Sequence, residues 1–373
     1  MSKYVYSSSP QIKSPTTTKR IMIDVCIALL PAVIAGIVLI AMAETSRGGS
    51  AIPNTINAIL LMALSCISAV GAEFVYKLCC KKDFATILKE FDFSSLVTGM
   101  LVGMNLYSTS KWYVAILASV FAIVVVKMIF GGTGKNLFNP AIAGRIFAFI
   151  SFGAAFGGTM HYTEKYITGV NGGYIVGATP LQGLFGEVDS TLTNLDLLLG
   201  TGVPGCIGET CKIALLLGGL YLVIRGVLNF RWPLVYILST GVFSVIVAWI
   251  TGYNAMIEAA KAADIVINSV LQSFYLQTAF IDALGAFIPS ILSGGLILGA
   301  VFMATDYVTT PNTKLGNYIY FLLCGALTAI LRYAAGSEVV SFVILFMNIL
   351  VPLFDMYIVR KPFGFVKAKK EAK

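Results

Sequence analysis

Long runs of apolar residues, separated by short polar stretches, recur along this chain and limit the folds open to it more than any other feature. A helix needs about 20 apolar residues to cross a hydrocarbon layer of about 30 Å, and a run such as residues 21–43 reaches that length. Apolar residues make up 57% of the chain and charged residues 12%, a composition unlike that of soluble domains. Because backbone hydrogen bonds must be satisfied internally within lipid, the pattern predicts an all-α integral membrane protein.

The apolar runs predict about ten membrane segments and two longer connections, at residues 158–209 and 252–283. The runs at 94–107 and 284–303 are short or interrupted by glycine, which is typical of helices that break inside the membrane. The predicted segments are 21–43, 54–78, 94–107, 112–130, 138–157, 210–229, 232–251, 284–303, 316–333 and 338–358.

The distribution of lysine and arginine predicts the orientation of these segments. With the N-terminus inside, nineteen of these residues fall on the inner side and six on the outer side, and Arg145 lies within the membrane. Positive residues favour the cytoplasmic side. We therefore expect the tails 1–20 and 359–373 in the cytoplasm and both long connections on the outer face. The bias also accounts for the net charge of +8 without a nucleic-acid partner.

The first long connection divides the chain into two halves of five segments, residues 21–157 and 210–358. The stretch TGMLVGMNLYSTS from Thr98 aligns with LGAVFMATDYVTT from Leu298, and a glycine, a tyrosine and a threonine coincide. An odd number of segments in each half inverts the second half relative to the first, and such repeats place functional sites near their interface. We therefore expect two inverted five-helix repeats.

The connection 158–209 contains the sequence Gly177-Ala178-Thr179-Pro180. Pro180 biases Thr179 toward an extended backbone, and Gly177 and Ala178 leave little bulk beside its hydroxyl. Glycine and proline at this density are also typical of an ordinary turn. An accessible threonine hydroxyl in this setting suits enzymatic esterification with a phosphate-bearing group.

A second glycine-rich stretch, GGTGKNLFNPAIAGRIF, covers residues 131–147. It is typical of a loop that enters a helix at Pro140, because proline is tolerated in the first helical turn. Its backbone amides and Lys135 could hold an anion or the edge of a ring, and a tight turn with no ligand explains the same residues. A phosphate loop is excluded, because that pattern needs glycine and serine or threonine where the chain has Ile129 and Asn136.

Charged residues near the membrane interior are functional candidates, since each costs about 2.5–3.5 kcal/mol at the bilayer centre. Glu73 is followed one helical turn later by Lys77, which favours a local ion pair. Lys127 is expected to reach the interface. Seven cysteines without a C-x-x-C pair and a single histidine, His161, predict no metal site. The charged candidates are Glu73, Lys127, Arg145, Asp306 and Asp355.

Several of these stretches together resemble one family of membrane subunits. The Gly177–Pro180 stretch resembles the flavin-attachment motif of the family that includes the D subunit of the Rnf complex and the B subunit of the sodium-pumping NADH:quinone oxidoreductase. Val176 stands where that family usually has serine or threonine, and Gly173 where it usually has aspartate. The other matching stretches follow the family's order along nearly the whole chain, and they are SPTTTKRIMIDVCIALLPA, GGTGKNLFNPAIAGRIF, GETCKIALLLGG, FMATD and PLFD.

The resemblance implies the D subunit of an Rnf complex in the inner cell membrane of a prokaryote, where electrons pass between ferredoxin and NAD and Na⁺ or H⁺ is moved. It implies FMN joined to Thr179 by a flavin transferase, on the outer face, and a non-covalent riboflavin in the region 131–145. The implied partners are Rnf subunits A, B, C, E and G, which must contact ferredoxin and NAD because this chain has no motif for either. The residues implied for the flavins and the cation are Gly177, Ala178, Thr179 and Pro180 for FMN, Asn136, Asn139 and Arg145 for riboflavin, and Asp306 for the cation.

Two alternatives fit the same sequence. The B subunit of the quinone reductase usually has a longer N-terminal extension than the 20 residues that precede the first segment here. A channel or transporter without flavin is the other alternative, because urea- and ammonium-type channels are also built from inverted five-helix repeats.

Overall fold

In the computed structural model, every regular element among the described residues is a helix, which confirms the predicted all-α membrane fold. The described residues are 16–45, 52–80, 83–156, 193–201, 203, 205–263, 269–335 and 338–359. The helices are α1 (Thr18–Thr45), α2 (Ile52–Cys79), α3 (Phe84–Lys89), α4 (Ser94–Met104), α5 (Trp112–Phe121), η1 (Ala122–Met128), α6 (Pro140–Ser151), α7 (Gly153–Phe156), α9 (Asn194–Leu199), α10 (Lys212–Ile224), α11 (Arg231–Ala262), α12 (Ser269–Gly285), α13 (Phe287–Leu292), α14 (Leu296–Leu298), η3 (Gly299–Met303), α15 (Lys314–Ala335) and α16 (Val340–Tyr357).

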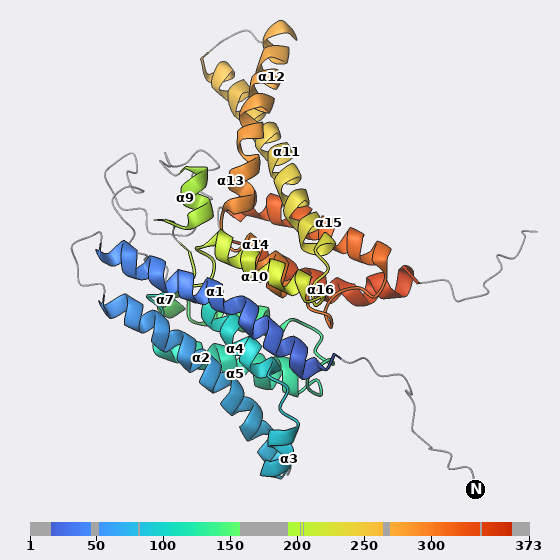
Figure 1. Ribbon diagram of the computed structural model, residues 1–373. Helices are drawn as coiled ribbons and strands as arrows, with labels where there is room; N and C mark the ends of the chain where they lie inside the picture. The colour runs from blue at the N-terminus through green and yellow to red at the C-terminus, as the bar shows by residue number, and fades with distance from the viewer. Residues whose placement is uncertain are drawn as a thin grey trace, which may run out of the picture.

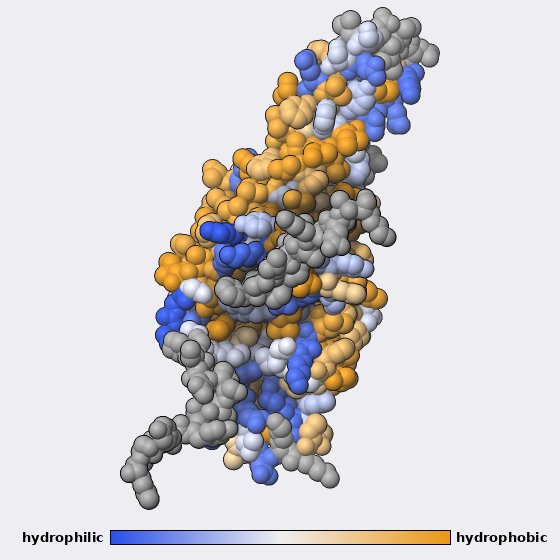
Figure 2. Space-filling model, turned by 90° about the vertical axis from the view of Figure 1, so that its right-hand side faces the viewer, coloured by the Kyte–Doolittle hydropathy of each residue, from blue (hydrophilic) through white to orange (hydrophobic). Residues whose placement is uncertain are grey.

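Six stretches are long and apolar enough to cross a membrane: α1, α2, α11, the stretch 271–292, α15 and α16. Large aliphatic side chains such as Ile34 and Ile67 point outward from these helices and are more than half exposed. Figure 2 shows that apolar residues cover much of this face of the bundle. Such a surface suits contact with lipid or with other membrane helices.

The helices α4, α6 and α10 are too short to cross the membrane alone. At about 1.5 Å per residue, the thirteen residues of α10 rise only about 20 Å. The short segment predicted at 94–107 is therefore confirmed, because α4 has eleven residues. The predicted break in 284–303 is also present, since α13 ends at Leu292 and α14 begins at Leu296. Between them, Gly294 has a φ of 63°, a conformation that favours glycine.

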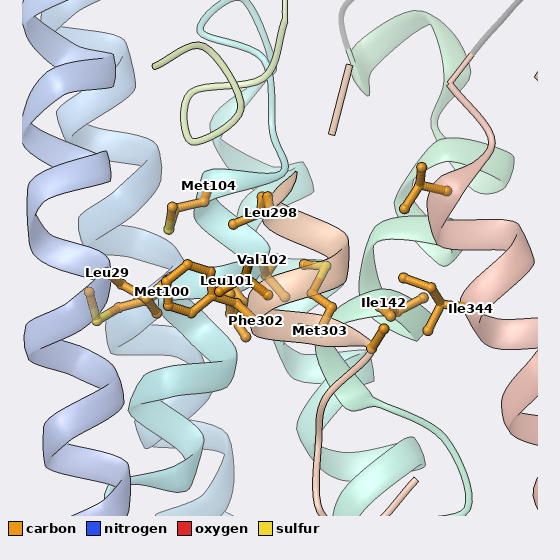
Figure 3. Close-up of a cluster of buried hydrophobic side chains, with 14 of the residues drawn as sticks. Leu29, Met100, Leu101, Val102, Met104, Ile142, Leu298, Phe302, Met303 and Ile344 are labelled. Atoms are coloured by element: carbon orange, nitrogen blue, oxygen red, sulfur yellow. The ribbon is translucent and has the colours of Figure 1, made fainter. Parts of the chain in front are cut away.

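The two predicted halves follow the same order of elements: α1, α2, α4, α5–η1 and α6, then α10, α11, α13–η3, α15 and α16. α1 packs along α10, with Gly218 against the backbone of Ala28. At the centre, Leu101 of α4 and Phe302 of η3 lie close together, as Figure 3 shows. This order agrees with the predicted repeats, and their inversion stays a prediction.

The connection predicted at 252–283 is helical over most of its length. α11 continues to Ala262 and α12 begins at Ser269, and Figure 1 shows the pair extending away from the rest of the bundle. Trp249 holds the pair together, because its Nε1 donates to the carbonyl oxygen of Leu276 at 3.1 Å. The stretch contains no proline and a single glycine, Gly252, so strong helix formers carry α11 beyond the apolar run.

Candidate functional site

The four residues of the predicted flavin-attachment motif, from Gly177 to Pro180, lie outside the described residues. The other predicted site residues are described. Asn136, Asn139 and Asp306 line one cavity, whereas Arg145 lies in a separate cluster of polar groups. The structure therefore brings three of the predicted residues together from two distant parts of the chain.

The cavity has a volume of about 130 Å³ and lies between α1, α4, η1, the loop before α6, and η3 with the loop after it. Leu101, Phe302 and Val25 supply apolar walls. Hydroxyl, amide and charged groups line the rest of the cavity. Most ligand sites combine apolar walls with a few polar groups in this way. The polar lining residues are Ser94, Thr98, Lys127, Thr133, Asn136, Asn139, Thr305 and Asp306.

The glycine-rich loop forms one wall because its backbone can turn where other residues would be strained. Gly131, Gly132 and Gly134 have φ values of 106°, 92° and 88°, which only glycine adopts readily. The loop then enters α6 at Pro140, as predicted. Asn139 is the N-cap of that helix, since its side-chain oxygen accepts from the Ala141 amide at 3.0 Å.

Asn139 also connects the two halves of the chain. Its Nδ2 donates to the carbonyl oxygen of Met303 at 2.9 Å, at the end of η3. That contact holds the start of α6 beside the residues that lead to Asp306. Among the described residues Asp306 forms no ion pair, and its carboxyl borders the cavity. The carboxyl group accepts from the Val308 amide at 3.5 Å, so it lies at the cavity wall with a hydrogen-bond donor but without a cationic partner among the described residues.

Lys127 faces the same cavity from the π-helical segment η1, and π-helical turns often occur at functional sites. Its Nζ donates to Glu73 Oε2 at 3.0 Å and to Ser94 Oγ at 2.6 Å. Lys77 donates to the other carboxylate oxygen of Glu73 at 2.5 Å, which confirms the local pair. The expectation that Lys127 reaches the interface is wrong, because its side chain is only 3% exposed and is held by Glu73.

Ser94 links Lys127 to a carboxylate nearer the surface. Its Oγ donates to Asp92 Oδ1 at 2.6 Å, and its backbone amide donates to the same oxygen at 3.1 Å. Burial raises the pKa of Asp92, but the hydrogen bonds from Ser94 and the charge of Lys127 outweigh it, so that this pKa lies below its usual value. Asp92 is therefore ionised near neutral pH.

Arg145 lies in a second hydrogen-bond network, which joins helices and neutralises the charge of Glu209. Its Nη1 donates to Asn105 Oδ1 at 2.7 Å, to Glu209 Oε1 at 2.8 Å and to Ser341 Oγ at 3.1 Å. Arg145, which the family resemblance implies for riboflavin, does not line the cavity. Glu209 and Ser341 are not among the candidates from the sequence, although Glu209 is the second residue of the GETCK stretch that resembles the family.

A neighbouring ion pair stabilises the break before α14. Arg332 donates to the carbonyl oxygens of Ser290 and Ser293 at 2.8 and 3.1 Å and pairs with Glu338 at 3.0 Å. Glu338 in turn accepts from the Gly295 amide at 3.1 Å. These groups satisfy backbone atoms that a broken helix would otherwise leave unpaired.

Two further acids join helices at the end of the bundle that bears the cavity. Asp24 of α1 accepts from Arg225 at 3.0 and 3.1 Å, next to the end of α10. Asp355 of α16 accepts from the backbone and the side chain of Asn312 at 2.8 and 2.7 Å. Asp355 thus has a structural role in this arrangement, and it does not line the cavity.

The fold and this site define a polytopic all-α membrane protein whose broken helices meet beside a polar cavity. The chain belongs to the NQR2, RnfD, RnfE family, whose sequence profile matches residues 5–364. The predicted family is thereby confirmed.

Curated relatives match the chain over nearly its full length. It is 36% identical to the D subunit of the Na⁺-translocating ferredoxin:NAD⁺ oxidoreductase complex of Acetobacterium woodii, over 98% of this chain and 97% of that protein. It is 30% identical to the D subunit of the proton-translocating ferredoxin:NAD⁺ oxidoreductase complex of Clostridium ljungdahlii, over 97% and 96%. It is also 30% identical to the D subunit of the ion-translocating oxidoreductase complex of Stutzerimonas stutzeri, over 91% and 90%.

Proposed function

We propose that this chain is the D subunit of a membrane complex that passes electrons between ferredoxin and NAD⁺ and couples them to ion transport. The observation that carries the proposal is the match to D subunits over almost the entire chain. The three relatives above are named as D subunits, which favours this function over the B subunit of a quinone reductase and over a channel. Other subunits of the complex, A, B, C, E and G, would contact ferredoxin and NAD⁺.

The covalent flavin is proposed to be FMN, joined through its phosphate to the hydroxyl of Thr179 by a separate flavin transferase. The sequence Gly177-Ala178-Thr179-Pro180 supports this position. Bound there, FMN would supply a group that exchanges single electrons, and the predicted orientation would put it on the outer face of the membrane. The chain itself contributes the acceptor hydroxyl and the unhindered backbone around it.

A non-covalent flavin, riboflavin, is proposed at the cavity beside the glycine-rich loop. The lining residues fit the chemistry of such a ring, because Leu101 and Phe302 offer apolar faces while Asn136 and Asn139 offer amide groups. When bound, riboflavin would supply a second electron carrier. The cavity of about 130 Å³ is smaller than most ligand sites, so part of the molecule would lie outside it.

Asp306 is proposed to handle the coupling cation, Na⁺ or H⁺. Its carboxyl borders the cavity and has no ion-pair partner among the described residues. An unpaired carboxylate can bind a cation or a proton, whereas one held by arginine or lysine has its charge already neutralised. We expect Asp306→Asn to reduce ion transport by the assembled complex more than electron transfer; equal losses would assign Asp306 a structural role.

Covalent flavin attachment can be tested on a denaturing gel. The full chain, coexpressed with a flavin transferase, should give a band that fluoresces under ultraviolet light. Thr179→Ala should abolish the fluorescence, and the matched substitution Thr168→Ala, in the same connection, should retain it. A dark wild-type band would overturn the FMN proposal and favour a channel or transporter without flavin.

A further inference from the structure

The buried Lys127 ammonium is the starting point for a proposal about proton movement. A lysine that is 3% exposed within a membrane bundle is costly unless it is paired. Glu73 supplies the opposite charge at 3.0 Å. Glu73 alone would be sufficient for that purpose, yet Lys127 also faces the cavity and donates to Ser94 at 2.6 Å. The contact with Ser94 is not needed to pair Lys127 with Glu73, and it extends the network toward Asp92.

A continuous row of hydrogen bonds runs from the cavity toward the end of the bundle. Lys127 donates to Ser94, and Ser94 donates to Asp92, with both donor-to-acceptor distances 2.6 Å. Asp92 precedes α4 and is only half-buried, whereas Lys127 and Ser94 are buried. The row therefore connects the amine of Lys127, which faces the cavity, to the carboxylate of Asp92 near the surface. The amine and the carboxylate can each gain or lose a proton, and the Ser94 hydroxyl between them can pass one on.

Four charged groups lie near Lys127, on α2, just before α4 and just after η3. Glu73 and Lys77 lie on α2, Asp92 precedes α4, and Asp306 follows η3 on the other side of the cavity. Glu73 and Asp92 balance Lys77 and Lys127, and Asp306 adds a further acid on the cavity wall. A negative charge added to the cavity therefore meets no excess of positive charge, and it would be balanced by drawing in one proton.

We propose that Asp92, Ser94 and Lys127 form a proton path from the half-buried end of α4 into the cavity. The proposal rests on the proposed flavin site, because a bound flavin would be the group that takes up the proton when its redox partner reduces it. The Lys127 ammonium would supply that proton from the wall of the cavity. Its amine then takes a proton from the Ser94 hydroxyl, and Ser94 takes one by way of Asp92, whose carboxylate is ionised at rest and picks up that proton transiently from solvent. One proton and one electron enter for each step, and only bonds to hydrogen form or break.

Ser94 is the best residue to test, because the helix offers a close control. Ser94→Ala removes the central hydroxyl, and Ser94→Thr restores one. Ser95→Ala removes a neighbouring hydroxyl that is fully buried and makes no hydrogen bond. These three variants separate a role in the path from a general effect of changing a buried serine in α4.

The experiment uses the purified full chain with added riboflavin. Binding is measured first by quenching of riboflavin fluorescence, and proton uptake is then followed with a pH-indicator dye after photoreduction of the flavin by light and an external electron donor. We expect Ser94→Ala, compared with the wild type at riboflavin concentrations that give both the same bound fraction, to slow proton uptake at least tenfold. Ser94→Thr and Ser95→Ala should stay within twofold of the wild type.

The outcomes distinguish this inference from the function on which it rests. If the wild-type chain does not quench riboflavin fluorescence, the proposed flavin site is overturned, and the path loses its acceptor with it. If riboflavin binds and Ser94→Ala takes up protons at the wild-type rate, the flavin site stands and the path is overturned. If Ser95→Ala slows uptake as much as Ser94→Ala, the effect belongs to the packing of α4, which also overturns the path.

Discussion

Two buried ion networks in this protein contain similar groups but differ in what surrounds them. The network of Arg145 is enclosed by protein, and its partners Asn105, Glu209 and Ser341 are each at most 3% exposed. The network of Lys127 borders a cavity and continues to the half-buried Asp92. The first satisfies its charges completely by joining the two halves of the chain, and the second leaves polar atoms facing open space. Buried charge alone therefore does not identify a functional site here.

The largest effect on stability is expected from Arg145→Met. It leaves Glu209 buried without its cation, and removing one partner of a buried pair costs about 3–5 kcal/mol. The apparent unfolding temperature of the full chain in detergent should fall well below that of Arg231→Met, a control at the exposed start of α11. Adding Glu209→Gln to Arg145→Met should recover part of the loss. Equal unfolding temperatures for Arg145→Met and the control would contradict the enclosed network.

A smaller loss of stability, about 2 kcal/mol, is expected from Lys127→Met. Glu73 would keep Lys77 at 2.5 Å, and the cavity would allow water to reach the carboxylate. The same unfolding measurement should therefore place this variant between wild type and Arg145→Met. A loss as large as that of Arg145→Met would show that the two networks do not differ in the way described above.

Gly294→Ala tests the break that lies beside the enclosed network. The substitution puts a side chain at a φ of 63°, which costs about 1–3 kcal/mol, and its Cβ would also collide with the Glu338 carboxylate. Gly226→Ala is the matched control, because Gly226 has a φ of 71° with no atom within 4 Å of the added carbon. The difference between their unfolding temperatures reports the Glu338 contact. No difference would mean that Glu338 moves away at little cost.

The sequence was sufficient to predict the membrane fold, the short α4 and the break before α14, because apolar length and glycine content are local properties. It was not sufficient for the α11–α12 pair. There, charged residues such as Glu258 and Lys261 lower the apolarity of a stretch whose helix propensity stays high. Boundaries drawn from hydropathy thus ended α11 too early.

For the candidate site, the sequence identified Asn136, Asn139 and Asp306 one by one, and the fold brought them together. The pair of Glu73 and Lys77 was predictable because residues four apart meet on a helix. The pairs Glu73–Lys127 and Arg145–Glu209 were not, since 54 and 64 residues separate their members. Only the tertiary packing of α2 with η1, and of α6 with the start of α10, determines those contacts.

The smallest effect is expected from Lys77→Met, and it sharpens the account of the Lys127 network. Lys77 is 15% exposed and pairs with Glu73 within a single helix, and such pairs contribute about 0.5 kcal/mol or less. Its unfolding temperature should lie close to that of the wild type and clearly above that of Lys127→Met. The reverse order would mean that Lys77 is the true counter-charge of Glu73. Lys127 would then be held chiefly by its hydrogen bond to Ser94 of α4.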